Sequence, residues 1–158
     1  MSDKVPMTIN GKRRLEEELK VLLTVERPTV IKAIEVARAN GDLSENADYS
    51  AAKERQSFIE GRIQEINAKI AMAEVIDTKA IKTDKIVFGA NVKLLDVDKD
   101  EEVTYQIVGV DEADAKQGRV GITSPIARAL IGKTVGDEVV VHAPKGKFSY
   151  EVIEVSYA

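Results

Sequence analysis

Two apolar seams in the first half of the chain constrain its fold more than any other feature. Apolar residues recur there at steps of four and three, in two stretches: Leu15, Leu19 and Leu22, and later Ile59, Ile63, Ile66, Ile70 and Ala73. Such spacing forms one stripe along an α-helix and is typical of a coiled coil. If the two helices pair antiparallel, the numbers of facing residues must add to a constant. The constant is 85 for all three pairs at the base: Leu15 with Ile70, Leu19 with Ile66, and Leu22 with Ile63. Half of it falls between Asp42 and Leu43, which predicts a hairpin that reverses there.

Pro28 interrupts the first of these helices. Proline removes a backbone donor and crowds the preceding turn, so we expect a kink or a short break at this position. Beyond it the constant becomes 86, in three pairs that are smaller or more polar: Val30 with Gln56, Ile34 with Ala52, and Ala37 with Tyr49. Each arm has roughly 30 residues, so the hairpin should extend about 45 Å.

The second half of the chain has the period of β-strands. The predicted strands cover residues 90–97, 103–110, 120–123, 138–142 and 148–155, joined by turn-rich links. One helix interrupts them, because Ser124 is a good N-cap, Pro125 suits the first helical turn and Gly132 suits the end. The sequence therefore predicts an α+β protein with two domains. Residues 1–76 form the coiled-coil hairpin, and residues 77–158 form a small, mostly antiparallel sheet with one helix, after a linker at 77–85.

The composition excludes several classes of protein. The chain has no cysteine, so it has neither disulfides nor thiolate metal ligands. Its apolar runs are too short to cross a bilayer and its N-terminus lacks the layout of a signal peptide, so we expect a cytoplasmic protein without membrane contact. A net charge of −4 argues against coating nucleic acid by bulk charge. Any contact with a polyanion must come from a local patch.

Four motifs resemble those of a known family. They are GDLSENADY at 41–49, IVFGA at 86–90, DEAD at 111–114 and SPIARALIGK at 124–133. In this order they are similar to the bacterial GreA/GreB transcript cleavage factors. The resemblance spans nearly the whole chain, and it implies that the second domain has an FK506-binding-like fold. It also implies that this domain sits at the mouth of the secondary channel of bacterial RNA polymerase, so that the coiled coil reaches the catalytic centre.

The acids at the predicted tip, Asp42 and Glu45, have two interpretations. As a capping box, Asp42 would cap the second helix and Glu45 would bond back to it. Two carboxylates cannot complete the six-oxygen shell of Mg²⁺ by themselves, so a metal role requires a second molecule. The resemblance implies that they hold a Mg²⁺ ion shared with the polymerase active site, which then cuts a backtracked nascent RNA near its 3′ end. The protein itself would then have no active site and no stably bound cofactor.

The same resemblance suggests roles for residues around the tip and in the second domain. Leu43, Ser44 and Asn46 would shape the loop, and Tyr49 would close the hairpin below it. Ser124 and Pro125 match positions near the polymerase contact, although helix capping explains them equally well. A basic patch is a separate inference from charge: Arg38, Lys53 and Arg55 would meet the RNA backbone if they share a face. A solvated helix face with compensating acids explains these three equally well.

Other apparent signals fail. Asp96, Asp98 and Asp100 match the start of a calcium loop, but Glu101 stands where glycine is needed, so we expect a charged hairpin turn. His142 has no evident triad partners. Three hypotheses remain: a monomeric cleavage factor that acts on polymerase, a stand-alone metal nuclease, and a coiled-coil adaptor or inhibitor that occupies the polymerase channel without stimulating cleavage. The nuclease is disfavoured because a two-acid tip has too few ligands and no pocket.

Overall fold

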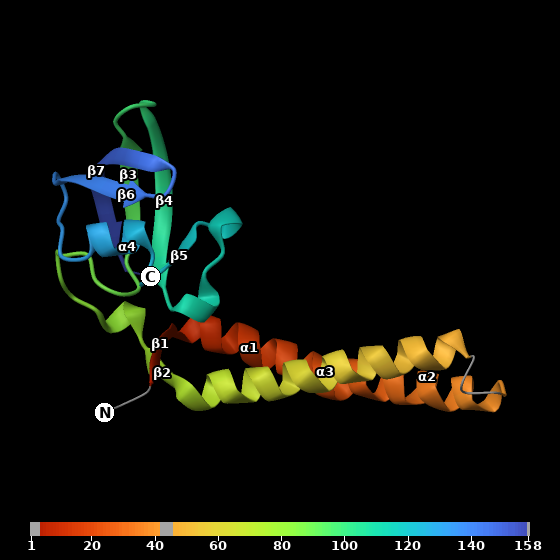
Figure 1. Cartoon of the computed structure of the whole chain (residues 1–158). Coiled ribbons are helices and arrows are strands. Elements are labelled where there is room, and N and C mark those ends of the chain that lie inside the picture. The colour runs from red at the N-terminus through yellow and green to blue at the C-terminus, as the bar shows by residue number, and fades with distance from the viewer. Residues whose placement is uncertain (1–3, 42–45, 158) are drawn as a thin grey trace. The chain divides into compact units, whose positions relative to one another are not determined.

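The first half of the chain forms an antiparallel helical hairpin, as predicted. The computed structural model describes residues 4–41 and 46–157. One arm contains α1 (Ile9–Val21), a π-helical turn η1 (Leu22–Glu26) and α2 (Arg27–Ala39), and the other is α3 (Ala47–Met72) (Figure 1). The chain therefore reverses between α2 and α3, in the stretch that contains the predicted point of reversal.

The seam between the arms is the apolar core that the residue spacing predicted. Its cluster contains Leu22, Val30, Ile59, Ile63 and Ile66, with Leu15, Leu19 and Ile70 packed against it. Ile66 is fully buried and Ile59 nearly so. Removing such side chains from water contributes about 1.5–3 kcal/mol each, which makes this seam the main source of the stability of the hairpin.

The predicted break at Pro28 is replaced by the π-helical turn η1, which lies just before it. The amide of Arg27 donates to the carbonyl of Leu22, five residues back, where an α-helix would bond four residues back. Two threonine hydroxyls donate to carbonyls in the same region: Thr24 to Lys20 at 2.7 Å and Thr29 to Val25 at 2.6 Å. The arm therefore continues through Pro28 as a helix, with one residue more than a regular α-helix needs.

Two ion pairs across the seam show the effect of that extra residue. Arg62 binds Glu18, with 2.7 Å between Nη2 and Oε1, and Arg55 binds Glu26 at 2.8 Å. Residues 18 and 26 are eight apart, whereas residues 55 and 62 are seven apart. The first arm thus uses one more residue than the second between equivalent pairs. This explains why the pairing constant changes by one past η1.

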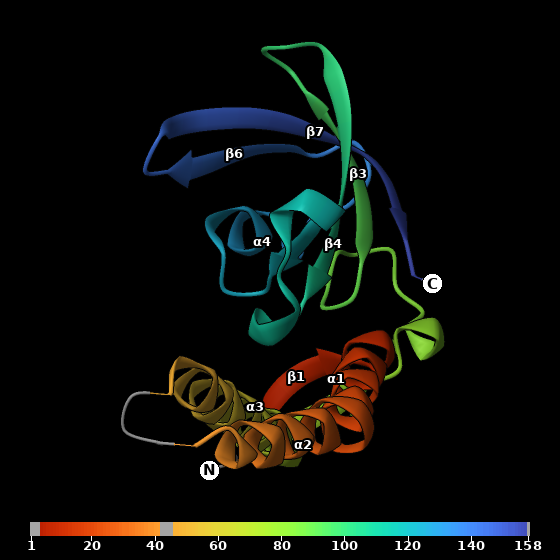
Figure 2. The same ribbon diagram turned by 90° about the vertical axis from the view of Figure 1, so that its right-hand side faces the viewer.

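The second compact unit is a curled sheet with one helix. Its five strands, in the order β5-β4-β3-β7-β6, are β3 (Asn91–Asp96), β4 (Glu101–Val108), β5 (Arg119–Gly121), β6 (Glu138–Ala143) and β7 (Gly146–Ser156). All neighbouring strands are antiparallel except β4 and β5. α4 (Pro125–Leu130) packs on β6 (Figure 2). Its Ala127 and Leu130 join the sheet residues in one buried core. The α+β fold and all five predicted strands are confirmed.

The compact units do not divide where the sequence predicted a domain boundary. β1 (Val5–Thr8) pairs in parallel with β2 (Ala73–Ile76), and both belong to the globular unit. That unit contains Met1–Gly11 with Ala73–Ala158, whereas the hairpin unit is Lys12–Met72. The predicted linker 77–85 contains a 3₁₀ turn, η2 (Thr78–Ala80), whose Thr78 is buried. We call the two parts the globular unit and the hairpin.

Candidate functional site at the end of the hairpin

Asn46 fixes the start of α3 and joins it to the end of α2. Its Oδ1 accepts a hydrogen bond from the amide of Tyr49 at 3.0 Å, which makes Asn46 the N-cap of α3. Its Nδ2 donates to the carbonyl of Ala37 at 2.7 Å, close to the last turn of α2. In the capping-box interpretation of the sequence, Asp42 would have been this cap. The capping prediction is corrected, because α3 begins only at Ala47.

The predicted tip acids, Asp42 and Glu45, lie outside the described residues, as do Leu43 and Ser44. Among residues 4–41 and 46–157, no three histidine, aspartate or glutamate side chains converge as a metal-binding group. The predicted Mg²⁺ ligands therefore remain a prediction. The described residues on either side of this stretch are helical: α2 ends at Ala39 and α3 begins at Ala47. The side chain of Asn46 connects the two helices through its hydrogen bond to Ala37.

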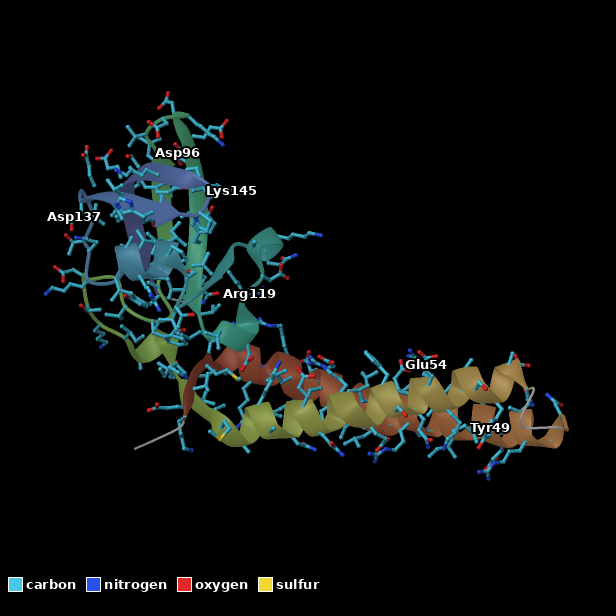
Figure 3. All side chains as sticks on the ribbon, viewed as in Figure 1. Tyr49, Glu54, Asp96, Arg119, Asp137 and Lys145 are labelled. Carbon is cyan, nitrogen blue, oxygen red and sulfur yellow. The ribbon has the colours of Figure 1, made fainter. Side chains whose placement is uncertain are left out.

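Tyr49 lies in the first turn of α3 and is half-buried (Figure 3). Its predicted partner across the seam, Ala37, is almost fully buried. The amide of Tyr49 is the group that Asn46 caps, so the ring is attached to the capped first turn of α3. The role of Tyr49 in closing the hairpin remains a prediction.

The three predicted basic residues do not share one face. On α3, Lys53 lies seven residues before Glu60, which is close to two helical turns, so the two lie on the same face of that helix. On α2, Arg38 lies eleven residues after Arg27, which is close to three turns, so these two also share a face. Arg27 binds Glu60 at 2.7 Å, so Arg38 and Lys53 lie on the flank of the hairpin that this ion pair marks. Residues two apart on a helix point in different directions, which places Arg55 elsewhere. It lies on the opposite flank, where it binds Glu26 at 2.8 Å.

Ion pairs along both flanks hold the arms together and shift the pKa values of the acids. Hydrogen bonds from Arg62 lower the pKa of Glu18, and those from Arg27 lower the pKa of Glu60. Hydrogen bonding to Lys69 likewise lowers the pKa of Glu65. These carboxylates stay ionised at neutral pH. Each is paired with a basic residue of the opposite arm or of the next helical turn, which makes it a poor candidate to bind another molecule.

A groove on the flank of Arg55 was not foreseen from the sequence. It encloses about 620 Å³ between α2 and α3. Small side chains, Ala33, Ala37, Ala51 and Ala52, form much of its wall, and the Glu26–Arg55 pair lies among its lining residues. The heptad pattern gives the buried seam but not this groove, which exists because alanines replace larger residues toward the end of the hairpin.

The predicted docking residues, Ser124 and Pro125, begin α4 in the globular unit. The hydroxyl of Ser124 accepts from the amide of Ala127 at 3.3 Å, so its capping role is confirmed. Pro125 lines a hollow of about 480 Å³ together with Thr123, Arg128, Ala129, Val140 and His142. A docking role for this face remains a prediction.

The predicted calcium-like turn is a hairpin turn, in which Asp96 Oδ1 accepts from the amides of Asp98 and Lys99.

Comparison with known proteins gives consistent matches over both parts of the chain. Residues 5–75 match the family described as "Transcription elongation factor, N-terminal", and residues 81–157 match "Transcription elongation factor, GreA/GreB, C-term". The chain is 55% identical over 157 residues to Transcription elongation factor GreA of Thermodesulfovibrio yellowstonii. It is 59% identical over 157 residues to that of Syntrophotalea carbinolica, and in both cases 99% of each chain is covered.

Solved structures are also similar to the chain. A structure of the transcription factor Gfh1 is 25% identical, with a TM-score of 0.47, and the match covers 98% of this chain and 99% of that one. A GreA/GreB elongation factor from Nitrosomonas europaea is 22% identical, with a TM-score of 0.43 and 98% coverage of both chains. Within the described residues, no helix has the length and apolar character that a membrane span requires.

Proposed function

Because the chain belongs to the GreA/GreB family of transcription elongation factors, we propose that it stimulates RNA cleavage by bacterial RNA polymerase. In this proposal the globular unit docks at the secondary channel of the polymerase, in the cytoplasm, and the hairpin enters the channel. The polymerase then cuts a backtracked nascent RNA with its own Mg²⁺-dependent activity. The factor acts on the polymerase and has no active site of its own.

The observation that carries this proposal is the identity of the cap of α3. Asn46 supplies the acceptor that the first turn of α3 needs, so neither Asp42 nor Glu45 is required for capping. The cap at Asn46 therefore leaves the two acids, which precede it in the sequence, as candidates for another task. In general, carboxylates close to the N-terminus of a helix gain from its dipole, which favours the charged form that a metal role requires.

Asp42 and Glu45 would hold Mg²⁺ jointly with ligands of the polymerase. Carboxylate oxygens are ligands that Mg²⁺ prefers, but two of them leave most of its six positions to water, phosphate or another protein. When bound, the ion would activate water and stabilise the leaving oxygen of the RNA. The task of this chain is to present the two acids, and the Asn46 link between α2 and α3 supports that task by restraining both helix ends.

The basic residues have different parts in this proposal. Arg38 and Lys53 share a flank and are the candidates to contact the phosphates of the extruded RNA. Arg55 is a weaker candidate, because Glu26 already neutralises it at 2.8 Å. Ser124 and Pro125, on the α4 face, are the candidates for docking on polymerase.

The test neutralises each acid without changing its size. Asp42→Asn and Glu45→Gln should reduce stimulation of cleavage in a stalled, backtracked complex at least tenfold at low Mg²⁺. Raising the Mg²⁺ concentration should restore part of it, because mass action replaces part of the lost affinity for the ion. Both variants should still compete with the wild type for polymerase. The matched control is Asp48→Asn, which neutralises another exposed acid in the first turn of α3.

Each alternative predicts a different result. A channel-occupying adaptor or inhibitor predicts that the wild type binds polymerase but leaves the cleavage rate unchanged or lowers it. A stand-alone nuclease predicts that the purified protein degrades free RNA. Full activity in both neutral variants at low Mg²⁺ would contradict the role of the tip acids.

A further inference from the structure

Glu112, in the DEAD motif, has a buried carboxylate that the proposed function does not use. It ends the 3₁₀ turn η3 (Val110–Glu112) and is 8% exposed. Its Oε2 accepts from the amides of Thr8 at 3.0 Å and Gly109 at 2.9 Å, and its Oε1 accepts from the hydroxyl of Thr8. Thr8, Gly11, Gly109 and Glu112 are called the Glu112 clasp below. All four belong to the globular unit.

The clasp caps the first helix of the hairpin from a distant part of the chain. Thr8 directly precedes α1, and its hydroxyl oxygen accepts from the amide of Gly11 at 3.0 Å. The same hydroxyl donates to Glu112, 104 residues away. The arrangement is similar to a capping box, except that the glutamate comes from η3 instead of from the third position of the helix. Bonds to an ionised carboxylate are about twice as strong as neutral ones.

Two glycines allow the backbone segments to approach this closely. A Cβ atom at Gly11 would lie 2.1 Å from Oε1 and 2.3 Å from Cδ of Glu112. A Cβ atom at Gly109 would lie 2.2 Å from the carbonyl oxygen of Pro6, in β1. Neither position has room for a side chain, so the clasp fixes η3 against β1 and the first turn of α1.

We propose that Glu112 is a positioning residue, which restrains the direction in which the hairpin leaves the globular unit. The basis is the continuity of α1: Gly11 is the last residue of the globular unit before the hairpin, and Lys12 is the first residue of the hairpin. A helix whose first turn is fixed transmits that restraint along its length, whereas a free first turn can pivot. The benefit for cleavage rests on the proposed function, because a tip that completes the active site of another molecule must reach that site in the correct position and orientation. The restraint itself is independent of that function.

Three substitutions weaken the clasp in different ways. Glu112→Gln keeps the size but turns one accepting oxygen into a donor that faces other donors. Thr8→Val keeps the shape and removes the hydroxyl. Gly11→Ala removes no hydrogen-bonding group and instead pushes the Glu112 side chain away. The matched control is Gly61→Ala in α3, where a Cβ atom has no neighbour within 4 Å.

The direct measurement is the distance between two spin labels, one on each unit. The chain has no cysteine, so labels can be attached at introduced cysteines without background. Suitable exposed positions are Lys32 in α2 and Asp98 in the turn between β3 and β4. Pulsed electron paramagnetic resonance should give a distance distribution that is at least twofold broader in the three clasp variants than in the wild type. Gly61→Ala should leave its width unchanged.

The outcomes separate positioning from general stability. A merely structural role would lower the melting temperature of the clasp variants without broadening the distribution, and this result would overturn the proposal. Thr8→Val decides the test if Glu112→Gln does not fold, since it leaves no donor facing a donor. In the cleavage assay, the clasp variants should lower the maximal stimulation at least threefold, with less than a twofold change in the concentration for half-maximal effect. If the wild type does not stimulate cleavage, the proposed function fails, and the spin-label distances still decide the clasp.

Discussion

At the scale of single residues, Asn46 makes two hydrogen bonds whose energetic roles can be separated. The bond from Tyr49 N–H to Oδ1 caps α3, and the bond from Nδ2 to the Ala37 carbonyl joins the two arms. A serine at this position is nearly as good a cap as asparagine, but its short hydroxyl cannot also reach the carbonyl of Ala37. Alanine can make neither bond.

We therefore predict a graded loss of stability at residue 46. Asn46→Ala should cost about 1–3 kcal/mol, the sum of a lost cap and a lost hydrogen bond, whereas Asn46→Ser should cost about 0.5–1.5 kcal/mol. Urea unfolding of the hairpin measures both values. Hydrogen exchange of the Tyr49 amide gives a local control, because it should accelerate in Asn46→Ala and much less in Asn46→Ser. Equal losses in the two variants would contradict the bond to Ala37.

The helix caps show which contacts can be predicted from the sequence. The motif Asp42-x-x-Glu45 fits a capping box, but several residues in this stretch are good caps, and the start of α3 decides among them. Ser124 was predicted correctly because Pro125 follows it and marks the first turn of the helix. Glu112 gave no local signal, since its partner Thr8 is 104 residues away. Local caps are thus predictable when their neighbours fix the helix start, and long-range ones are not.

At the scale of elements, the π-helical turn η1 explains both the tolerance of Pro28 and the shift of register. A π turn absorbs one extra residue with little rotation of the helix beyond it, so Val30 stays in the seam although it is eight residues from Leu22. The residue numbers revealed the one-residue shift. They could not show where the extra residue lies, because both sides of Pro28 have regular helical spacing.

This account predicts that the extra residue can be removed at one place only. Deleting Thr24 together with Pro28→Ala should give a regular α-helix with an unbroken seam, and the melting temperature should stay within about 5 °C of the wild type or rise. Deleting Lys32 in α2 is the matched control. It should rotate the helix beyond it by about 100° and turn Ile34 and Ala37 out of the seam. Circular dichroism of both deletions tests the prediction, which equal melting temperatures would contradict.

At the scale of the whole molecule, the units interleave along the chain. The globular unit contains both ends of the chain, and the hairpin is an insertion between β1 and β2. The sequence predicted a division at residue 76 because the apolar period changes there. It did not reveal β1, since four residues give too short a pattern to identify a strand that pairs with a segment far along the chain. Met7 is 1% exposed, so this short strand contributes a buried apolar side chain.

The interleaving predicts which fragment of the globular unit is stable. A fragment of residues 77–158 lacks β1 and β2, so it loses the burial of Met7, worth about 1.5–3 kcal/mol, and the bonds of Thr8 to Glu112. A chain in which a flexible glycine-serine linker of about ten residues replaces residues 12–72 keeps both strands. It should therefore unfold at a higher urea concentration than the fragment 77–158.

Under the proposed function the linked chain should also compete with the full-length protein for polymerase without stimulating cleavage. Substituting Thr8→Val in the linked chain should remove part of its advantage over the fragment, because the advantage comes from the contacts of β1. If the fragment 77–158 proves as stable as the linked chain, β1 does not stabilise the globular unit.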